Sequence, residues 1–277
     1  MRNSGTVRGT ITVIEIYRCV RYVIVPSSLD EGFILSKQTR MHFQEFLKAK
    51  GFYTGNIDGI IGSRTKAAIL NCFQCKTATA ITDVELFQFA KLLGDTNTVR
   101  IRTVAEVESN GSGWFNDGRP KILYERHKFW KYNDDATAPK STFFNYPDAG
   151  NYTIDADKNG INDSYDKLLK ACEYDPMGAF MSVSMGAFQV MGFYFKEMGY
   201  ATPWEMLYDC ARSEKAQYQL LVNYIVMNKL QKAFLAISGK PDTCRMFASG
   251  YNGKNYAKYN YHGKLASAYL YYLNKVK

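Results

Sequence analysis

A glutamate followed by a polar, glycine-rich turn is the first group in this chain that could do acid–base chemistry. Glu108 ends the apolar helical pattern of residues 98–109, just before a run of Ser, Asn and Gly. A carboxyl group in such a place can be partly removed from water, which raises its pKa, and can still meet a substrate. The sequence therefore predicts a general acid at Glu108, with an ordinary solvated helix-end glutamate as the alternative.

Other titratable side chains lie nearby in the sequence. Glu106 is the runner-up for the acid. Two residues on a helix are about 200° apart, so Glu106 and Glu108 should not face the same groove. Glu125 is a candidate for substrate binding, with an internal ion pair to Arg126 or to a neighbouring helix as the alternative. We interpret His127 as a histidine of the core or of the edge of a groove.

Neutral hydrogen-bonding side chains occur further along the chain. Gln189, Tyr251 and Asn252 are suited to binding hydroxyl and amide groups, and we predict that they bind substrate. No second carboxylate stands at a spacing that would mark a nucleophile. Asp117 and Asp175 remain candidates for a base, for positioning water or for a structural role.

Residues 155–166 form a separate acidic signal. Oxygen-bearing side chains and one glycine occupy positions 1, 3, 5, 6, 9 and 12 of a calcium-binding loop: Asp155, Asp157, Asn159, Gly160, Asp163 and Asp166. Position 8 is Asn162 instead of an apolar residue, and no clear helix precedes the loop. A structural Ca²⁺ site and a polar surface turn therefore remain open, and we expect that catalysis itself requires no cofactor.

The elements that must position these groups belong to a globular protein. The 277 residues are 46% hydrophobic and 22% charged, which allows one or two domains with a sizeable core. The net charge of +9 favours a polyanionic partner. Since the basic residues are scattered, we expect no nucleic-acid binding. Residues 11–25 are too short and too charged to span a bilayer and lack a cleavage site, so we expect synthesis in the cytoplasm without a signal peptide and no stable membrane insertion.

The cysteines do not indicate a disulfide framework, because their spacing is irregular in a long chain. Cys72 and Cys75 form a lone C-x-x-C without the second pair that a zinc site would need. We interpret them as reduced thiols.

Hydrophobic periodicity divides the chain into three parts. Residues 1–36 alternate like strands, or form a poorly ordered arm, and receive no function. Residues 37–94 predict a small unit whose first helix starts at Ser36, a candidate N-cap, and stops at Gly51. A third helix, at about 83–93, closes onto the two earlier ones. Residues 98–277 predict a mainly α domain with helices at 98–109, 120–132, 164–172, 186–198, 203–209, 213–237, 241–249 and 262–274.

The second part resembles the three-helix peptidoglycan-binding module. The resemblance rests on the positions Phe43-Gln44, Gly51, Gly55, Asp58-Gly59, Gly62, Thr65, Ala68 and Phe73-Gln74. A generic helix–turn–helix would explain the glycines without a ligand. The resemblance implies that residues 37–94 bind the bacterial wall.

The third part resembles the N-acetylmuramidase family of phage endolysins, which is related to lysozymes and lytic transglycosylases. Four ordered motifs carry the resemblance: Val107-Glu108-Ser109, residues 113–127, residues 184–192 and residues 247–253. It implies a lysozyme-like helical fold and hydrolysis of the β-1,4 bond between N-acetylmuramic acid and N-acetylglucosamine, with Glu108 as the general acid. A lytic transglycosylase with the same acid and a non-catalytic wall-binding protein are the alternatives. The resemblance also implies release to the cell wall through a holin, and we expect a monomer.

Overall fold

The structure is a computed structural model that describes residues 29–109 and 111–276. The expectation of a mainly α fold is confirmed, since helices dominate these residues and the strands are short. In the first part of the chain, the helices are α1 (Leu29–Ala49), α2 (Ser63–Cys72), α3 (Asp83–Leu92) and α4 (Val99–Glu108). The remaining elements are β1 (Ile122–Tyr124), α5 (Arg126–Tyr132), α6 (Asp163–Cys172), α7 (Pro176–Met181), β2 (Val183–Met185), β3 (Val190–Met191), the 3-10 helix η1 (Gly192–Tyr194), α8 (Pro203–Arg212), α9 (Glu214–Met227), α10 (Gln231–Leu235), α11 (Pro241–Asn252) and α12 (Tyr261–Val276).

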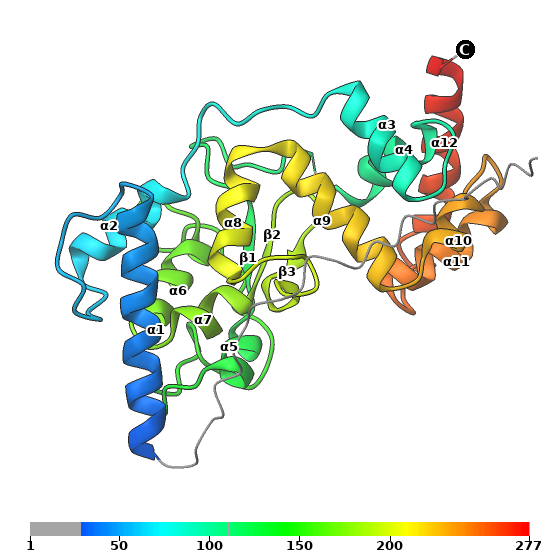
Figure 1. Cartoon of the computed structure of the whole chain (residues 1–277). Coiled ribbons are helices and arrows are strands. Elements are labelled where there is room, and N and C mark those ends of the chain that lie inside the picture. Colours follow the sequence, from blue (N-terminus) through cyan, green and yellow to red (C-terminus); the bar gives the residue numbers. More distant parts are fainter. Residues whose placement is uncertain (1–28, 110, 277) are drawn as a thin grey trace, which may run out of the picture.

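The helices gather at two ends of the molecule. At one end α1 and α2 lie beside α6, α7 and α8, and at the other end α4 packs against α12, with α10 and α11 nearby (Figure 1). Helix α9 runs between the two ends and contacts α3, α8, α10 and β3. The groove described below therefore has walls that come from both ends.

A small antiparallel sheet replaces two of the predicted helical segments. Strands β1, β2 and β3 pair in that order, with Leu123 opposite Ser184 and Ser184 opposite Met191. The predicted helix at 120–132 is therefore wrong in its first half, and the predicted α-helix at 186–198 is wrong throughout, because that stretch holds β3, the 3-10 helix η1 and turns. Gly186 and Gln189 have φ of 73° and 50°, values that break a right-handed helix and form the turn between β2 and β3.

The first described helix begins earlier than expected. Helix α1 starts at Leu29, so the predicted start at Ser36 is wrong. Ser36 lies inside the helix, is buried and donates a hydrogen bond to Asp135, which also pairs with Arg40 at 3.0 Å. The rest of the stretch for which strands or an arm were predicted, residues 1–28, lies outside the described part of the chain.

The packing of the first three helices also differs from the expectation. The ring of Phe43 in α1 lies 5.1 Å from the rings of both Phe180 and Trp204, so α1 shares a core with α7 and α8. The main packing partners of α3 are α4 and α9, and α3 lies apart from α1 and α2 in Figure 1. The expectation that α3 closes a unit with α1 and α2 is therefore wrong.

The motif glutamine and aspartate of this region build a turn. Gln44 is buried; its side-chain oxygen accepts hydrogen bonds from the backbone N–H groups of Asp58 and Gly59, and its amide donates to the Asp58 carboxylate and to the carbonyl of Ile60. Gly59 has a φ of 75° and lies against Lys37, so a side chain there would be strained and crowded. The residue types at these motif positions are therefore explained by the structure of the turn, without a bound ligand.

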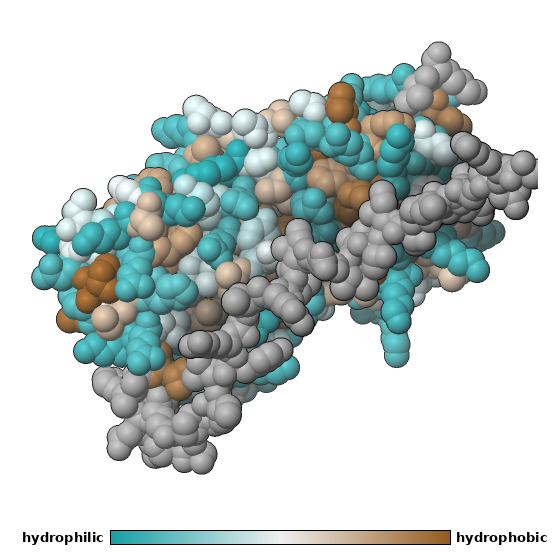
Figure 2. Space-filling view, viewed as in Figure 1, coloured by the Kyte–Doolittle hydropathy of each residue, from teal (hydrophilic) through white to brown (hydrophobic). Residues whose placement is uncertain are grey.

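On the face seen in Figure 2, hydrophilic side chains dominate and apolar ones form small scattered groups. Among residues 29–109 and 111–276, no helix combines the length and the apolar character that crossing a bilayer requires. All the cysteines in the described part, including Cys72 and Cys75, are free thiols, as expected.

Candidate active site

A groove of about 1050 Å³ runs past the end of α4. One wall comes from α4, α11 and α12, and the facing wall comes from the β2–β3 turn, β3 and η1, with α9 at the base. The side chains that decide its chemistry are Glu106, Glu108, Gln189, Met191, Phe193, Tyr194, Tyr224, Tyr251, Asn252, Tyr261 and Lys264. A space of this size, lined by aromatic rings and a few polar groups, is suited to sugar rings.

Glu108 is held at the groove by the way α4 ends. Val104 and Ala105 are buried, and α4 packs its length against α12. Ser109 leaves the helix with an extended ψ of 142°, so Glu108 is the last helical residue and its side chain reaches the groove. Burial raises the pKa of the Glu108 carboxyl from 4.5 to about 7, against the opposing effects of a hydrogen bond from Asn252 and the charge of Lys264. A large part of the Glu108 population is therefore protonated near neutral pH.

The partner of Glu108 comes from the end of α11. Asn252 donates a hydrogen bond from Nδ2 to Oε1 of Glu108 over 2.9 Å, and Gly253, with a φ of 75°, ends the helix directly after it. The Tyr251 ring stacks on Phe247 at 5.6 Å and meets Tyr224 edge-on at 5.1 Å. Burial and the charge of Glu108 raise the pKa of the Tyr251 hydroxyl well above 10. Tyr251 is therefore a neutral, fixed wall of the groove.

Gln189 lies on the facing wall. Its φ of 50° is unusual for a residue with a side chain. Oε1 accepts a hydrogen bond from Ser184 over 2.7 Å, and Nε2 donates to the carbonyl of Gly186 over 2.8 Å. The side chain thus holds the β2–β3 turn together while its exposed surface lines the groove.

Glu106 is exposed and borders the groove from outside. Its carboxylate accepts a hydrogen bond from the hydroxyl of Tyr272 over 3.2 Å. It also lines a neighbouring cavity of about 780 Å³, which adjoins the groove along Glu106, Ser109 and Phe188. The expectation that Glu106 points away from the groove altogether is therefore wrong, although its environment is far wetter than that of Glu108.

Glu125 lines neither cavity. It precedes α5, accepts a hydrogen bond from the Tyr152 hydroxyl over 2.7 Å and lies 3.2 Å from Nδ1 of His127. Arg126 instead donates to backbone carbonyls, including that of Asp148. The structure therefore does not bring Glu125 to the other candidate site residues, and Glu125 pairs with His127 instead of Arg126.

Asp117 and Asp175 have structural surroundings. Asp117 forms an ion pair with Arg119 within a tight turn. Asp175 caps α7 by accepting a hydrogen bond from the N–H of Met177, and burial raises the pKa of its carboxyl to about 6. Neither lines the groove, so in the described part of the chain Glu106 and Glu108 are the carboxylates that do.

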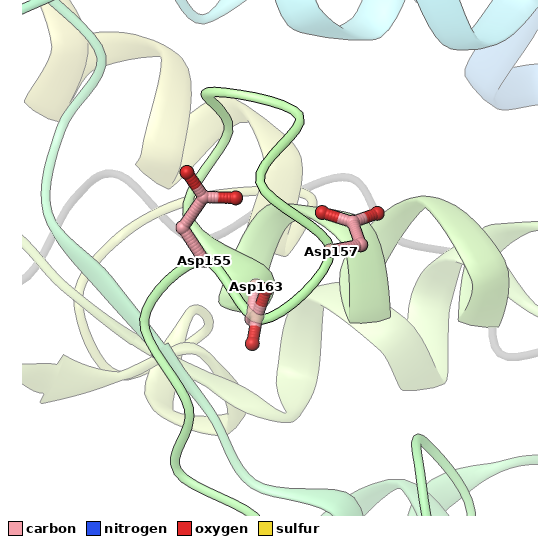
Figure 3. A group of neighbouring side chains, drawn as sticks. All are labelled: Asp155, Asp157 and Asp163. Carbon is pink, nitrogen blue, oxygen red and sulfur yellow. The ribbon is translucent and has the colours of Figure 1, made fainter.

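The acidic loop lies away from both cavities and brings its carboxylates together. Ligand oxygens of Asp155, Asp157 and Asp163 lie within 4.8 Å of one another. Figure 3 shows Asp155 and Asp157 on two sides of the loop, with Asp163 below and between them at the start of α6. Burial and the neighbouring carboxylates raise the pKa of Asp166, while a hydrogen bond from Asn159 lowers it.

Several groove residues had no sequence signal. Tyr224 and Tyr194 face the groove from α9 and η1, and Lys264 comes from α12. Nothing in their spacing separates these tyrosines from the other tyrosines of the chain, which mostly pack in the core or on the surface. Lys264 lies outside the four motifs, and only the packing of α12 on α4 brings its charge to Glu108.

A helical fold with one buried, protonatable carboxyl in an aromatic-walled groove is typical of enzymes that cleave glycosidic bonds. Comparison with protein families agrees: the N-acetylmuramidase family model matches residues 97–273. The chain belongs to the N-acetylmuramidase family, whose members are glycoside hydrolases that act on peptidoglycan.

The fold is similar to a solved structure, the crystal structure of the Burkholderia AP3 phage endolysin. The two share 29% sequence identity and a TM-score of 0.61, over 86% of this chain and 95% of that one. The comparison with curated proteins gave no match.

Proposed function

We propose that this protein is a phage endolysin that cleaves the β-1,4 bond between N-acetylmuramic acid and N-acetylglucosamine, with Glu108 as the general acid. The observation that carries the proposal is the Glu108 carboxyl itself: it is partly buried at the groove, its pKa is raised to about 7, and Asn252 donates a hydrogen bond to it. An acid of this strength is protonated often enough to act and still gives up its proton to a leaving oxygen. Membership of the N-acetylmuramidase family supports the same assignment.

The first step is proton transfer from Glu108 to the glycosidic oxygen as the bond breaks. Positive charge then develops on the sugar ring, and the carboxylate left behind becomes negative. Asn252 donates its hydrogen bond to this carboxylate, and the charge of Lys264 favours the same ionised form. Both groups therefore stabilise the carboxylate as the proton leaves.

The second step requires a nucleophile and a group that takes its proton. Of the carboxylates in residues 29–109 and 111–276, Glu106 and Glu108 line the groove, and both come from α4. The facing wall offers Gln189, Met191 and Tyr194 instead. We propose that the nucleophile is a water molecule, which forms a bond to the sugar carbon that carried the leaving oxygen. Ionised Glu108 then takes up the proton that this water loses.

The same geometry favours a second candidate reaction. A single acid with no carboxylate on the facing wall could also accept the proton of the muramic acid 6-hydroxyl, which would make the enzyme a lytic transglycosylase. Mass spectrometry of digested peptidoglycan separates the two: reducing N-acetylmuramic acid ends mean hydrolysis, and 1,6-anhydro ends mean transglycosylation. Reducing N-acetylglucosamine ends would contradict both.

We also propose that residues 37–94 hold the enzyme on the wall, as the resemblance of this stretch suggests. The turn fixed by Gln44 presents the side chain of Ile60, which is 66% exposed. Tethering would raise the effective concentration of the substrate, and the net charge of +9 favours an anionic wall. In a pelleting assay with insoluble peptidoglycan, Ile60→Asp should weaken binding of the Glu108→Gln protein, and Met246→Asp, at an equally exposed site on α11, should not.

The alternative of a non-catalytic wall-binding protein makes a different forecast. Under it, Glu108→Gln protein would clear a cell-wall suspension as fast as the wild type.

We propose action on the cell wall after holin-mediated release, which fits a phage endolysin without a role for membrane insertion.

A further inference from the structure

We propose that the loop of residues 155–166 binds one calcium ion, which fixes the start of α6 against the sheet. The loop lines neither the groove nor the adjoining cavity. The proposal is therefore independent of whether the chain cleaves peptidoglycan, and its failure would leave the proposed function unchanged.

The observation that points to a ligand is a set of buried oxygens without partners. Asp163 is 3% exposed; its Oδ1 accepts a hydrogen bond from the N–H of Ala156, but its Oδ2 accepts none from the described part of the chain. Oδ1 of Asp155 and Oδ2 of Asp166 are buried and unpartnered in the same way. A buried carboxylate oxygen without a donor is costly, so three of them in one loop call for a cation.

The loop geometry brings carboxylate oxygens from three of its positions together. Ligand atoms of Asp155, Asp157 and Asp163 lie within 4.8 Å of one another; the three side chains are drawn in Figure 3. Nδ2 of Asn159 donates hydrogen bonds to a carboxylate oxygen of Asp157 over 3.0 Å and to one of Asp166 over 3.3 Å, while its Oδ1 accepts one from the N–H of Ile161. These contacts connect the last position of the loop to the others.

The sharp turn of the loop also suits a bound cation. Gly160 has a φ of 79°, and its N–H donates to Asp155 over 3.3 Å, which turns the chain back toward α6. The backbone carbonyl of Ile161 stands at position 7 of the twelve, where calcium loops use a carbonyl.

The chemistry of the donor set selects calcium. All the side-chain donors are hard oxygens, and with the Ile161 carbonyl they number about six, the lower limit for Ca²⁺. Position 12 is Asp166, which is one methylene shorter than the glutamate that chelates through both oxygens, so we expect a Kd toward the weak end, between about 1 µM and 1 mM. Two ammonium groups belong to this region: Lys158 lies in the loop, and the charge of Lys167 reaches Asp163 and Asp166. They leave the four carboxylates with a surplus of negative charge.

The effect of binding follows from what α6 holds. The hydroxyl of Ser164 accepts a hydrogen bond from the N–H of Tyr124 over 3.3 Å, and the hydroxyl of Tyr165 donates to the carbonyl of Pro120 over 2.9 Å. The helix thus braces both ends of β1. Asp163 also donates its N–H to the carbonyl of Ile154 over 2.8 Å, which ties the loop to its own base. Calcium would therefore stabilise the fold through α6 and β1, from a loop that lines neither cavity.

Thermal unfolding and calorimetry of the full chain test the proposal, with CaCl₂ added to protein freed of metal by EDTA. We expect one saturable site per chain and a rise in Tm of about 5 °C or more at 100-fold excess over Kd. MgCl₂ at the same concentration should give a clearly smaller shift, because Mg²⁺ demands tighter octahedral geometry. No saturable binding and no shift up to about 10 mM Ca²⁺, or an equal shift with Mg²⁺, would overturn the proposal.

Two variants make the test specific. Asp157→Asn should abolish the calcium-dependent shift, and without calcium it should melt no lower than the wild type, because it removes repulsion among the carboxylates. Asp148→Asn removes the same charge from an exposed aspartate outside the loop and should keep the full shift. If Asp157→Asn retained the calcium response, or if Asp148→Asn lost it, the shift would reflect general charge screening and the site would be rejected.

Discussion

The side chain of Asn252 donates a hydrogen bond to Glu108 over 2.9 Å, although the two residues are 144 positions apart in the sequence. The contact joins the end of α4 to the end of α11, and it opposes the rise in the pKa of Glu108 that burial causes. Burial keeps the carboxyl protonated near neutral pH, and Asn252 makes its ionised form accessible. An acid used in catalysis must reach both states.

The first prediction concerns the acid itself. Glu108→Gln should lower kcat by about 10²–10⁴-fold, because an amide cannot protonate the leaving oxygen, and it should leave the fold intact because it keeps the oxygen that Asn252 contacts. Glu106→Gln is the matched control and should keep kcat within about threefold, since Glu106 is exposed. Release of soluble muropeptides measures both. If Glu106→Gln lost activity and Glu108→Gln kept it, Glu106 would be the general acid instead of Glu108.

The second prediction is a pH dependence. Glu108 acts in its protonated form. We therefore expect kcat/KM to be at its maximum below the pKa of Glu108, about 7, and to fall about tenfold per pH unit above it. Asn252→Ala removes a hydrogen bond to the charged form, so the pKa should rise and the alkaline limb should move up by about 1–2 pH units, with lower maximal activity. A pH profile of kcat/KM on wall fragments measures the shift. Movement of the limb to lower pH would contradict the assigned role of Asn252.

Part of this site was predictable from sequence. Glu108 stands where a helical pattern meets a glycine-rich turn, and Tyr251 and Asn252 stand in a short motif, and all three come together in the groove. Glu125 does not, because β1 ends one residue before it and directs it toward Tyr152 instead. Its place depends on a strand of three residues, which is too short to leave a periodic signal.

The helices of the catalytic part were largely predictable, but their breaks were not. The predicted helix at 213–237 is interrupted because Lys229 adopts a φ of 56°, which separates α9 from α10. No proline or glycine marks this break. The packing partners of α1 were likewise not predictable from sequence. The apolar helix face that contains Phe43 could pack inside a small module or, as the structure has it, in a larger core with Trp204.

The third prediction tests that shared core. Phe43 is fully buried between Phe180 and Trp204, so Phe43→Ala should lower the free energy of unfolding by about 3–5 kcal/mol. Because the core is continuous, the loss should appear in the main transition, followed by Trp fluorescence and by circular dichroism together. Phe87→Ala, at a residue that is 37% exposed on α3, should cost less than about 1 kcal/mol. A new early transition that leaves the main one unchanged would mean that residues 37–94 unfold alone.

The fourth prediction links the acid to stability. The folded state raises the pKa of Glu108 from 4.5 to about 7, so between these values it binds more protons than the unfolded state, and the stability from this group falls as pH rises. The full shift corresponds to about 3 kcal/mol, and partial exposure of the side chain reduces it to about 1–3 kcal/mol.

Glutamine has no such titration. Glu108→Gln should therefore match the wild type near pH 4 and exceed its free energy of unfolding by about 1–3 kcal/mol at pH 8, with the difference developing between pH 4.5 and 7. Urea unfolding at pH 4, 6 and 8 measures this, with Glu106→Gln as the control that shows no such trend. A gain that is equal at every pH would mean that Glu108 titrates alike in both states, and it would remove the physical basis for its acid strength. A gain that follows the predicted window would show that the protein gives up stability at this residue to keep its proton near neutral pH.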